Sequence, residues 1–312
     1  MGDERTALLT GAATGLTEAA GTGGTAVTSG TTGATEVLGD PEAVRRAADA
    51  LAEGCAVVHG FANFYALTAR ADRETVTRVN RLKGRPDGWT GSVVTVPSGL
   101  SALFDWTRLP AELPRRQIWS LMAELYELGP FGFRGPAAPA VPEHLTAPGA
   151  GQGTPAGSPS GSGGRSVQVV APGRHCPSNA FLAAALDRTG AAYLFVTSAN
   201  RPGELPHWRG GAALRDFHAE PGVRVLAHPD DEAARRRHPH HAPVSVSILS
   251  FDRAAGRGRS GLPALTLERQ GSLSAAYVRS VAANHGFAVT LAPAADGTPP
   301  PAPRVYLPPV RR

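Results

Sequence analysis

The chain has 312 residues, enough to bury a sizeable core in one large domain or two small ones. Its formal net charge of +5 suits a polyanionic ligand such as a nucleotide or RNA. The two cysteines indicate no disulfide framework, and no apolar run approaches the roughly 20 residues that span a membrane. The N-terminus lacks the basic and apolar regions of a signal peptide, so we expect a cytoplasmic protein.

The first segment, residues 1–38, is rich in Gly, Thr and Ala and has no sustained period, which predicts a disordered leader. Ordered structure is expected from Asp40, which suits an N-cap and is followed by Pro41 at the first helical position. Asp72 is expected to cap a second helix. Periodicity predicts helices at 40–54, 72–82 and 110–127 and strands at 56–59 and 92–96.

Residues 135–165 are almost entirely Gly, Pro, Ala and Ser, and such a stretch buries too little apolar area to order itself. We expect a flexible insertion, which is either a boundary between two domains or a loop within one. Ser178 is expected to cap the next helix, and the Pro-rich segment 291–312 is expected to form a disordered tail. The remaining predicted elements are helices at 178–190 and 274–285 and strands at 166–170, 191–197, 223–227, 244–251 and 265–269.

The folded part is therefore expected to comprise 39–134 and 166–290. Helices and strands alternate along it, which indicates an α/β protein with helices covering a sheet. In such sheets, ligand sites gather at strand ends. Two polar segments have that placement.

The first polar segment is Lys83-Gly84-Arg85-Pro86, at the end of a predicted helix. Two cations separated by one glycine can converge on a phosphate chain, with lysine as a point charge and arginine as a two-pronged donor. Taken alone, this segment fits a solvated basic turn better.

The second polar segment is Thr197-Ser198-Ala199-Asn200, which ends a predicted strand. Small hydroxyl and amide side chains next to the backbone resemble the donors of an anion cradle. The alternative is ordinary turn chemistry, because Ser, Asn and the following Gly203 all favour turns.

In this order, the two segments resemble the paired signature of the YrdC-like family, the threonylcarbamoyl-adenylate synthases. Other similarities are Phe64-Tyr65-Ala66-Leu67 to a Val-Tyr-Gly-Leu segment, Leu128-Gly129-Pro130 to a Pro-Gly-Pro turn, and Leu267–Gly271 to a late Arg-x-Gly strand. The resemblance covers residues 40–275, interrupted by the Gly/Pro insertion. It implies a YrdC-like α/β fold, with a twisted mixed sheet, flanking helices and a basic ligand groove.

The resemblance also implies an activity. The family uses ATP to condense an amino acid and bicarbonate into a carbamoyl-adenylate, as a nucleotidyltransferase, with Mg²⁺ accompanying the ATP. The amino acid is L-threonine or another, and the family's product feeds the synthesis of threonylcarbamoyladenosine in tRNA. By motif position, Lys83 and Arg85 would be the catalytic cations on the phosphates, and Thr197, Ser198 and Asn200 would contact the nucleotide.

Four further residues are candidates by the same resemblance. Arg269 would help to close the groove, and Ser247 would face the nucleotide from a late strand. Asn63 and Tyr65 would lie at the substrate pocket, because they fall in or beside the segment that resembles Val-Tyr-Gly-Leu.

The sequence departs from the family where the amino acid and carbamate are held. The family's Pro-Thr-Asp-Thr is Gly60-Phe61-Ala62-Asn63 here, a threonine after the Pro-Gly-Pro turn is Gly132, and an arginine is Val170. Loss of groups that bond a hydroxyl relaxes selection for it. Together with Phe64 and Trp89, these changes predict a larger or more apolar pocket.

Two alternatives remain open. A non-catalytic paralogue would keep the fold and bind nucleotide or double-stranded RNA, which the fold has been associated with, and a specialised biosynthetic role would also fit the altered pocket. His238, His240 and His241 lie in a basic run and are expected in an exposed loop, which could touch RNA, rather than in a metal site, because Pro239 interrupts their spacing.

Overall fold

The helices begin at the capping residues that the sequence supplies. In the computed structural model, which describes residues 36–148, 164–201, 203–252 and 255–292, the Asp40 side chain accepts a hydrogen bond from the Glu42 N–H before α1 (Pro41–Ala52). Asp72 does the same for the Thr75 N–H before α2 (Arg73–Leu82). The remaining helices are α3 (Arg115–Leu128), α4 (Ser178–Thr189), α5 (Gly210–Phe217), α6 (Asp231–Arg236) and α7 (Ala275–Asn284).

The predicted cap of α4 is wrong. Ser178 is the first residue of that helix, and no side chain caps it. The Ser178 hydroxyl instead lies 3.0 Å from the Cys176 sulfur, which is buried. The C-terminal end is as predicted, because Gly190 adopts a left-handed conformation with φ 62°.

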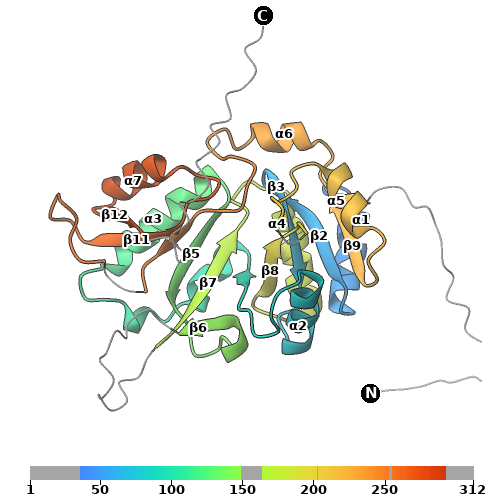
Figure 1. Ribbon diagram of the computed structural model, residues 1–312, viewed down its shortest axis with the longest axis horizontal. Helices are drawn as coiled ribbons and strands as arrows, with labels where there is room; N and C mark the ends of the chain where they lie inside the picture. Colours follow the sequence, from blue (N-terminus) through green and yellow to red (C-terminus); the bar gives the residue numbers. More distant parts are fainter. Residues whose placement is uncertain (1–35, 149–163, 202, 253–254, 293–312) are drawn as a thin grey trace, which may run out of the picture. The chain divides into compact units, whose positions relative to one another are not determined.

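The described strands form one mixed sheet of twelve strands (Figure 1). The short β6 (Thr146–Pro148) pairs only with β7. The order of the others is β1 (Glu36–Val37), β9 (Val223–Ala227), β2 (Ala56–Phe61), β3 (Phe64–Ala69), β8 (Leu194–Ser198), β4 (Ser92–Val94), β7 (Arg165–Ala171), β5 (Phe131–Pro136), β10 (Ile248–Ser250), β11 (Ala264–Arg269) and β12 (Ala288–Leu291).

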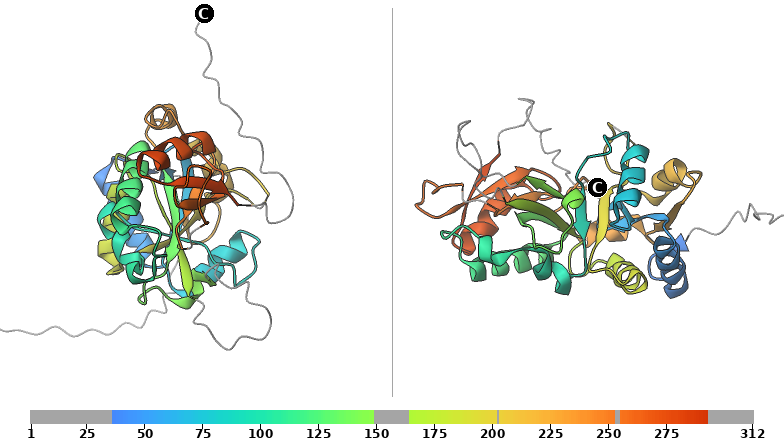
Figure 2. Two further views of the ribbon diagram at one scale, coloured as in Figure 1. Left: turned by 90° about the vertical axis from the view of Figure 1, so that its left-hand side faces the viewer. Right: turned by 90° about the horizontal axis from the view of Figure 1, so that it is seen from below.

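Each face of the sheet has its own hydrophobic core, because successive side chains of a strand point to opposite faces. Along β3, Tyr65 and Leu67 belong to one core and Phe64 and Ala66 to the other. Residues of α2, α3, α5 and α7 join the first core, whereas α1 and α4 join the second, so helices lie on both sides of the sheet (Figure 2). On the second face, α1 and α4 pack mainly over β1, β9 and β2. On the same face, the part of the sheet formed by β4, β7 and β5 carries a pocket.

The boundaries of the folded part differ from those expected. Glu36–Leu38, which we assigned to the leader, carry β1 and a buried Leu38. Residues 135–148, which we assigned to the insertion, contain the end of β5, a 3₁₀ turn at Glu143–Leu145 and β6. Buried Val141 and Leu145 anchor this stretch despite its Pro and Ala content. The rest of the leader, the insertion and the tail lie outside the described residues, apart from 164–165 and 291–292.

The two parts of the chain on either side of the insertion belong to one sheet. β5 and β7 are antiparallel neighbours, with Phe131 opposite Ala171 and Pro136 opposite Ser166. The segment between them therefore connects adjacent strands and does not separate two cores. No helix in the described ranges is long and apolar enough to cross a membrane.

Two of the three clustered histidines are buried, so the expectation of an exposed loop is wrong for them. His238 is 5% exposed and His241 is 4% exposed, whereas His240 is exposed. The His241 Nδ1 lies 3.0 Å from the Ser272 hydroxyl. Burial lowers the pKa of His241 to about 3, with a further contribution from the other two histidines.

Candidate functional site

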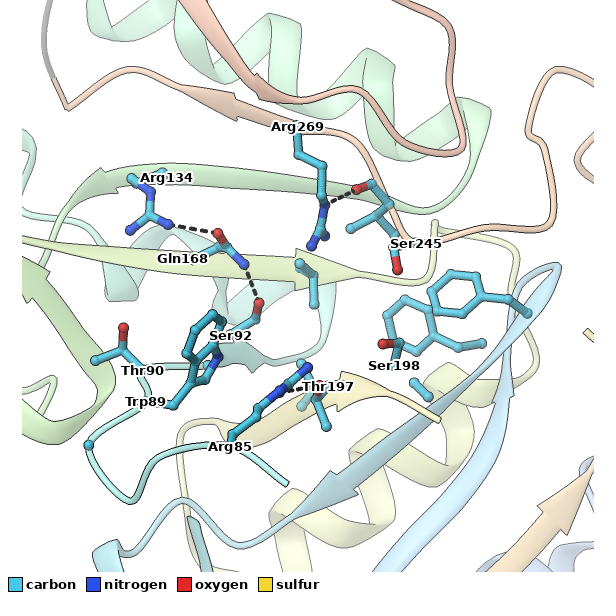
Figure 3. A pocket seen from close by; sticks show the side chains of 18 residues that line it. Arg85, Trp89, Thr90, Ser92, Arg134, Gln168, Thr197, Ser198, Ser245 and Arg269 are labelled. Carbon is cyan, nitrogen blue, oxygen red and sulfur yellow. Dashed lines mark hydrogen bonds between the residues drawn. The ribbon is translucent and has the colours of Figure 1, made fainter. Parts of the chain in front are cut away.

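A pocket of about 440 Å³ opens on the second face of the sheet (Figure 3). Its floor comes from alternate positions of four neighbouring strands, which side-chain alternation sends to the same face. Ser92 of β4 lies opposite Val196 of β8, and Arg134 of β5 lies opposite Gln168 of β7. The rim comes from the loop after α2 and from Ser245 and Val246, which precede β10.

Two arginines face each other across the pocket in Figure 3. Arg85 donates from Nη1 to the Thr197 hydroxyl at 2.9 Å, and Arg269 donates from Nε to the Val246 carbonyl at 2.7 Å. Burial lowers the pKa of Arg85, and desolvation together with Arg134 and Arg85 lowers the pKa of Arg269 to about 10, although the Arg269 residue as a whole is exposed. Both guanidinium groups remain charged near neutral pH. Neither forms an ion pair with a carboxylate in the described part of the chain. Glu268, which is paired with Arg134, acts on Arg269 only through space, so the pair provides two positive charges that no carboxylate contacts directly.

A third arginine on the pocket wall is already paired. Arg134 forms an ion pair with Glu268 at 2.6 Å and donates to the Gln168 side-chain oxygen at 2.8 Å. Gln168 in turn donates to the Ser92 hydroxyl. These hydrogen bonds and the ion pair link side chains of four strands and fix the orientation of the Gln168 amide, so their main effect is to order the floor.

One end of the pocket is apolar. Phe61 and Phe64, which flank the two-residue turn between β2 and β3, contribute to it, and their ring centroids are 5.4 Å apart. Val170 and Val196 complete the floor. Phe61, which belongs to the segment that departs from the family's Pro-Thr-Asp-Thr, and Phe64 thus both line the pocket.

Lys83 does not line the pocket. The side chain is 3% exposed, and its ammonium donates to the Ser198 carbonyl at 2.9 Å, to the Asn200 carbonyl and to the Asn200 side-chain oxygen at 2.9 Å. Burial, with Arg85 and Arg201 nearby, lowers the pKa of Lys83 to about 7. All three donors of the ammonium group are used within the protein. Lys83 therefore holds the turn after β8.

Asn200 is used in the same turn. Its side-chain oxygen also accepts from the Ser198 hydroxyl at 2.7 Å, and its side-chain amide donates to the Arg201 and Glu204 carbonyls at 3.0 and 2.7 Å. Thr197 and Ser198 line the pocket next to this turn. In the Thr197–Asn200 segment, Thr197 and Ser198 line the cavity, and the Asn200 side chain stabilises the turn beside them.

The other three predicted residues lie away from the pocket wall. Ser247 is fully buried, donates to the Leu273 carbonyl at 2.8 Å, and accepts from backbone N–H groups. Asn63 donates to the His241 and Ala242 carbonyls at 2.8 and 2.9 Å. Tyr65 points to the opposite face, where its hydroxyl donates to Asp231 at 2.8 Å.

Several lining residues were not foreseen as site residues. Ser245, two positions before Ser247, lines the pocket. It was missed because alternation alone does not fix the register of this segment. Arg134 and Gln168 adjoin the Gly/Pro stretch, whose composition concealed the strand pairing around it. The available signal for β5 was the alternation of two apolar residues, Phe131 and Phe133, with Gly132 and Arg134.

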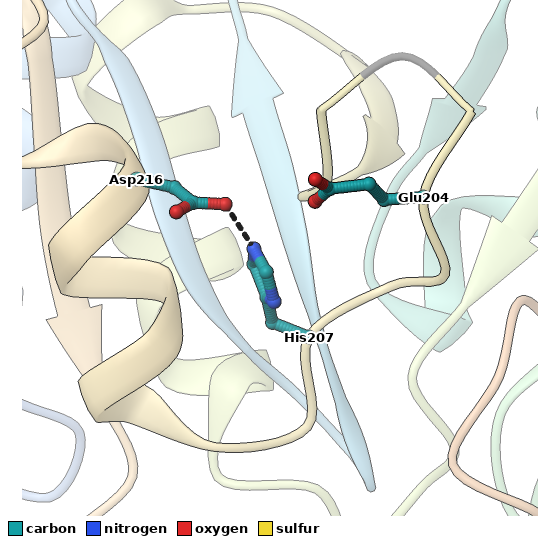
Figure 4. A group of neighbouring side chains, drawn as sticks. All are labelled: Glu204, His207 and Asp216. Carbon is teal, nitrogen blue, oxygen red and sulfur yellow. Dashed lines mark hydrogen bonds and ion pairs between the residues drawn. The ribbon is translucent and has the colours of Figure 1, made fainter.

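A second polar group lies beyond the turn after β8. Ligand atoms of Glu204, His207 and Asp216 lie within 4.8 Å of one another, a set that could hold a metal ion (Figure 4). The His207 Nε2 lies 2.6 Å from Asp216, and the His207 N–H donates to the Ala199 carbonyl at 3.3 Å. These contacts fasten the segment after β8 to α5.

Comparisons with known proteins connect this fold to solved structures. No protein-family model matches the sequence, and a comparison with curated proteins finds no match. Sua5 from P. abyssi, solved in complex with L-threonine, matches with a TM-score of 0.58 and 18% identity over 83% of this chain and 62% of that one. The hypothetical protein smu.1377c from Streptococcus mutans matches with a TM-score of 0.54 and 13% identity, over 79% of this chain and 93% of that one. A weaker match, at a TM-score of 0.47 and 16% identity, is full-length HypF in a phosphate- and nucleotide-bound form, over 73% of this chain and 29% of that one.

The first two matches establish the fold. The chain has the α/β fold of YrdC/Sua5-like domains, with a large twisted mixed sheet and flanking helices, and it is a divergent example at 18% identity or less to these two structures. It spans less than two thirds of the P. abyssi Sua5 chain.

Proposed function

We propose that the pocket binds ATP and an amino-acid carbamate and joins them into a carbamoyl-adenylate. The observation that carries this proposal is the pair of guanidinium groups without a direct ion-pair partner, Arg85 and Arg269, beside Thr197 and Ser198 and next to an apolar end. Guanidinium forks and hydroxyls suit phosphate oxygens, and an apolar end suits an organic side chain. The complex of the structurally similar Sua5 with L-threonine supports an amino acid as co-substrate.

The proposed reaction begins with the amino group and bicarbonate, which form a carbamate and water. A carbamate oxygen then attacks the α-phosphorus of ATP, the bond from that phosphorus to the bridging oxygen breaks, and pyrophosphate leaves with the bond's electrons. This step needs positioning and charge neutralisation more than a proton transfer. Arg85 and Arg269 would neutralise the phosphates, and the Thr197 hydroxyl, which accepts from Arg85 and keeps its own proton, would orient them. Exclusion of water by Phe61 and Phe64 would protect the carbamate.

Mg²⁺ would enter with the nucleotide as its substrate complex. Protein ligands for this ion are usually carboxylates. No Asp or Glu belongs to the described pocket wall, so the residues present do not form a protein-held magnesium site. Phosphate oxygens and water would complete the coordination.

The decisive experiment measures pyrophosphate release from ATP across a panel of amino acids, with and without bicarbonate, and searches for the adenylate by mass spectrometry. We expect release that requires bicarbonate and one class of amino acid. A matched pair of variants, Arg85→Met in the pocket and Arg81→Met outside it, should separate a site effect from a general one. If neither the wild type nor the Arg81→Met control releases pyrophosphate with any amino acid, the proposed catalysis is contradicted.

The alternative is a module that binds nucleotide without turning it over. It is favoured by Lys83, whose three donors are engaged by the turn after β8 instead of facing the pocket. ATP binding in the absence of any pyrophosphate release would support this alternative. Titration with double-stranded RNA at two salt concentrations tests the RNA arm, because binding through phosphates weakens steeply with salt.

A further inference from the structure

Trp89 is exposed in an unusual place. Three large hydrophobic side chains are exposed in the described part of the chain, namely Trp89, Leu205 and Leu291. Of these, Trp89 alone lines the pocket, and it is 50% exposed. An indole left in contact with water at a pocket wall can gain much apolar contact when a ligand covers it.

The loop that carries Trp89 is fixed at its backbone. The Trp89 N–H donates to the Pro86 carbonyl at 2.9 Å, and the buried Asn80 side chain donates to the Trp89 carbonyl at 2.9 Å. Gly91 packs directly against the Phe195 ring, where a β-carbon would lie 2.2 Å from Cε2. The indole is therefore presented from a held segment, which lowers the entropy cost of covering it.

The surroundings of Trp89 suit a heteroaromatic ring attached to an anion. The Arg85 guanidinium carbon lies 5.4 Å from the indole centroid. In Figure 3, Trp89 and Thr90 lie beside Ser92, on the side of the pocket away from Ser198 and Ser245, with Arg85 and Arg269 between the two sides. Ser92 accepts from Gln168, which leaves its own hydroxyl proton free to be donated to a ligand.

We propose that Trp89 is the stacking platform for the nucleobase and makes the pocket selective for purine nucleotides. The base lies on the indole, with the Thr90 and Ser92 hydroxyls at its edge, and the phosphates extend to Arg85 and Arg269. The carbamate then falls at the end lined by Phe61 and Phe64. This inference rests on the proposed function and assigns the order of the ligand's parts along the pocket.

The test compares ATP, CTP and inorganic tripolyphosphate by isothermal titration calorimetry on the full chain. In Trp89→Ala we expect ATP binding to weaken by roughly 5- to 150-fold, the range for loss of one stacked base, and tripolyphosphate binding to stay within about twofold of wild type. Trp89→Phe should recover most of the affinity, and the preference for ATP over CTP should shrink in Trp89→Ala. Leu205→Ala, which removes an exposed side chain outside the pocket, is the matched control and should bind ATP like wild type.

Different results separate this inference from the proposed function. Unchanged ATP binding in Trp89→Ala overturns the stacking role, and so does an equal loss of ATP and tripolyphosphate, which would mean a general effect on the pocket. If the wild-type chain binds ATP through Trp89 but forms no adenylate, the proposed catalysis is wrong and the stacking role stands. A wild-type chain that binds no nucleotide overturns both.

Discussion

The Lys83 ammonium lies 2.9 Å from the side-chain oxygen of Asn200, so the two polar segments that are 117 positions apart in sequence meet in one buried hydrogen-bond network. The network also includes the Ser198 carbonyl, at 2.9 Å from Nζ. Through it, Lys83 acts on the pocket by fixing the turn that follows Thr197 and Ser198.

Substitution of Lys83 should therefore reduce stability before it affects chemistry. In Lys83→Met the stem is kept, but three oxygens lose their donor, and we expect the free energy of unfolding to fall by about 3 kcal/mol in a urea titration. Arg81→Met is the matched control, because the Arg81–Asp87 pair is exposed and should contribute less than about 1 kcal/mol. Wild-type stability combined with lost ATP binding in Lys83→Met would show instead that Lys83 contacts the ligand.

The three pocket arginines should differ in their effect on ATP binding. Arg85→Met and Arg269→Met each remove a charge that has no direct ion-pair partner and should weaken ATP binding by about 1.5–3 kcal/mol, measured by calorimetry. Arg134→Met should cost less, because Glu268 already neutralises this guanidinium at 2.6 Å. Equal losses at all three positions would argue against a phosphate site between Arg85 and Arg269. Circular dichroism checks that Arg269→Met still folds, since Arg269 also binds the Val246 carbonyl.

Two glycines of the Trp89 loop should respond differently to the same substitution. A β-carbon at Gly91 would lie 2.2 Å from the buried Phe195 ring, whereas one at Gly88 would meet nothing within 4 Å. We expect Gly91→Ala to lower the free energy of unfolding by about 1–3 kcal/mol through overpacking, and Gly88→Ala to change it by less than about 0.5 kcal/mol. Comparable urea midpoints for the two variants would contradict the packing of this loop against β8.

Acid should destabilise the fold through three buried histidines. Burial is the main cause that lowers the pKa of His59 and His241 to about 3 and of His228 to about 4. Because the unfolded chain binds these protons near pH 6.5, it takes up more protons than the folded chain, and the free energy of unfolding falls as the pH drops from about 6.5 towards 4. Each histidine should contribute up to about 1.4 kcal/mol per pH unit in that window.

The share of one histidine in this dependence of stability on pH can be measured separately. His59 is fully buried, with Nε2 2.8 Å from the Thr68 hydroxyl and Nδ1 3.1 Å from the Gly60 carbonyl. His59→Gln should reduce the slope of stability against pH between 6.5 and 5 by about 1.4 kcal/mol per unit, measured by urea unfolding. His218→Gln, at an exposed position, is the control for the substitution itself. An identical slope in His59→Gln and wild type would mean that His59 is protonated in the fold.

The sequence alone was sufficient for the fold class and for two of the segments that line the candidate pocket. Caps at Asp40 and Asp72 act on nearest neighbours, so they are readable from local chemistry. The segments around Arg85 and Thr197 were identified by residue type and order, and both reach the pocket.

Tertiary structure decided which polar atoms face the ligand. A side chain's hydrogen-bond partners depend on segments distant in sequence. Lys83 donates to Ser198 and Asn200. Ser247 donates to the Leu273 carbonyl, and Asn63 donates to the His241 carbonyl. Residues such as Arg134 and Gln168 became part of the site only because β5 and β7 pair in one register. Motifs specify which groups are present, whereas strand register and burial, set by packing over the whole sheet, determine which of those groups remain free to bind.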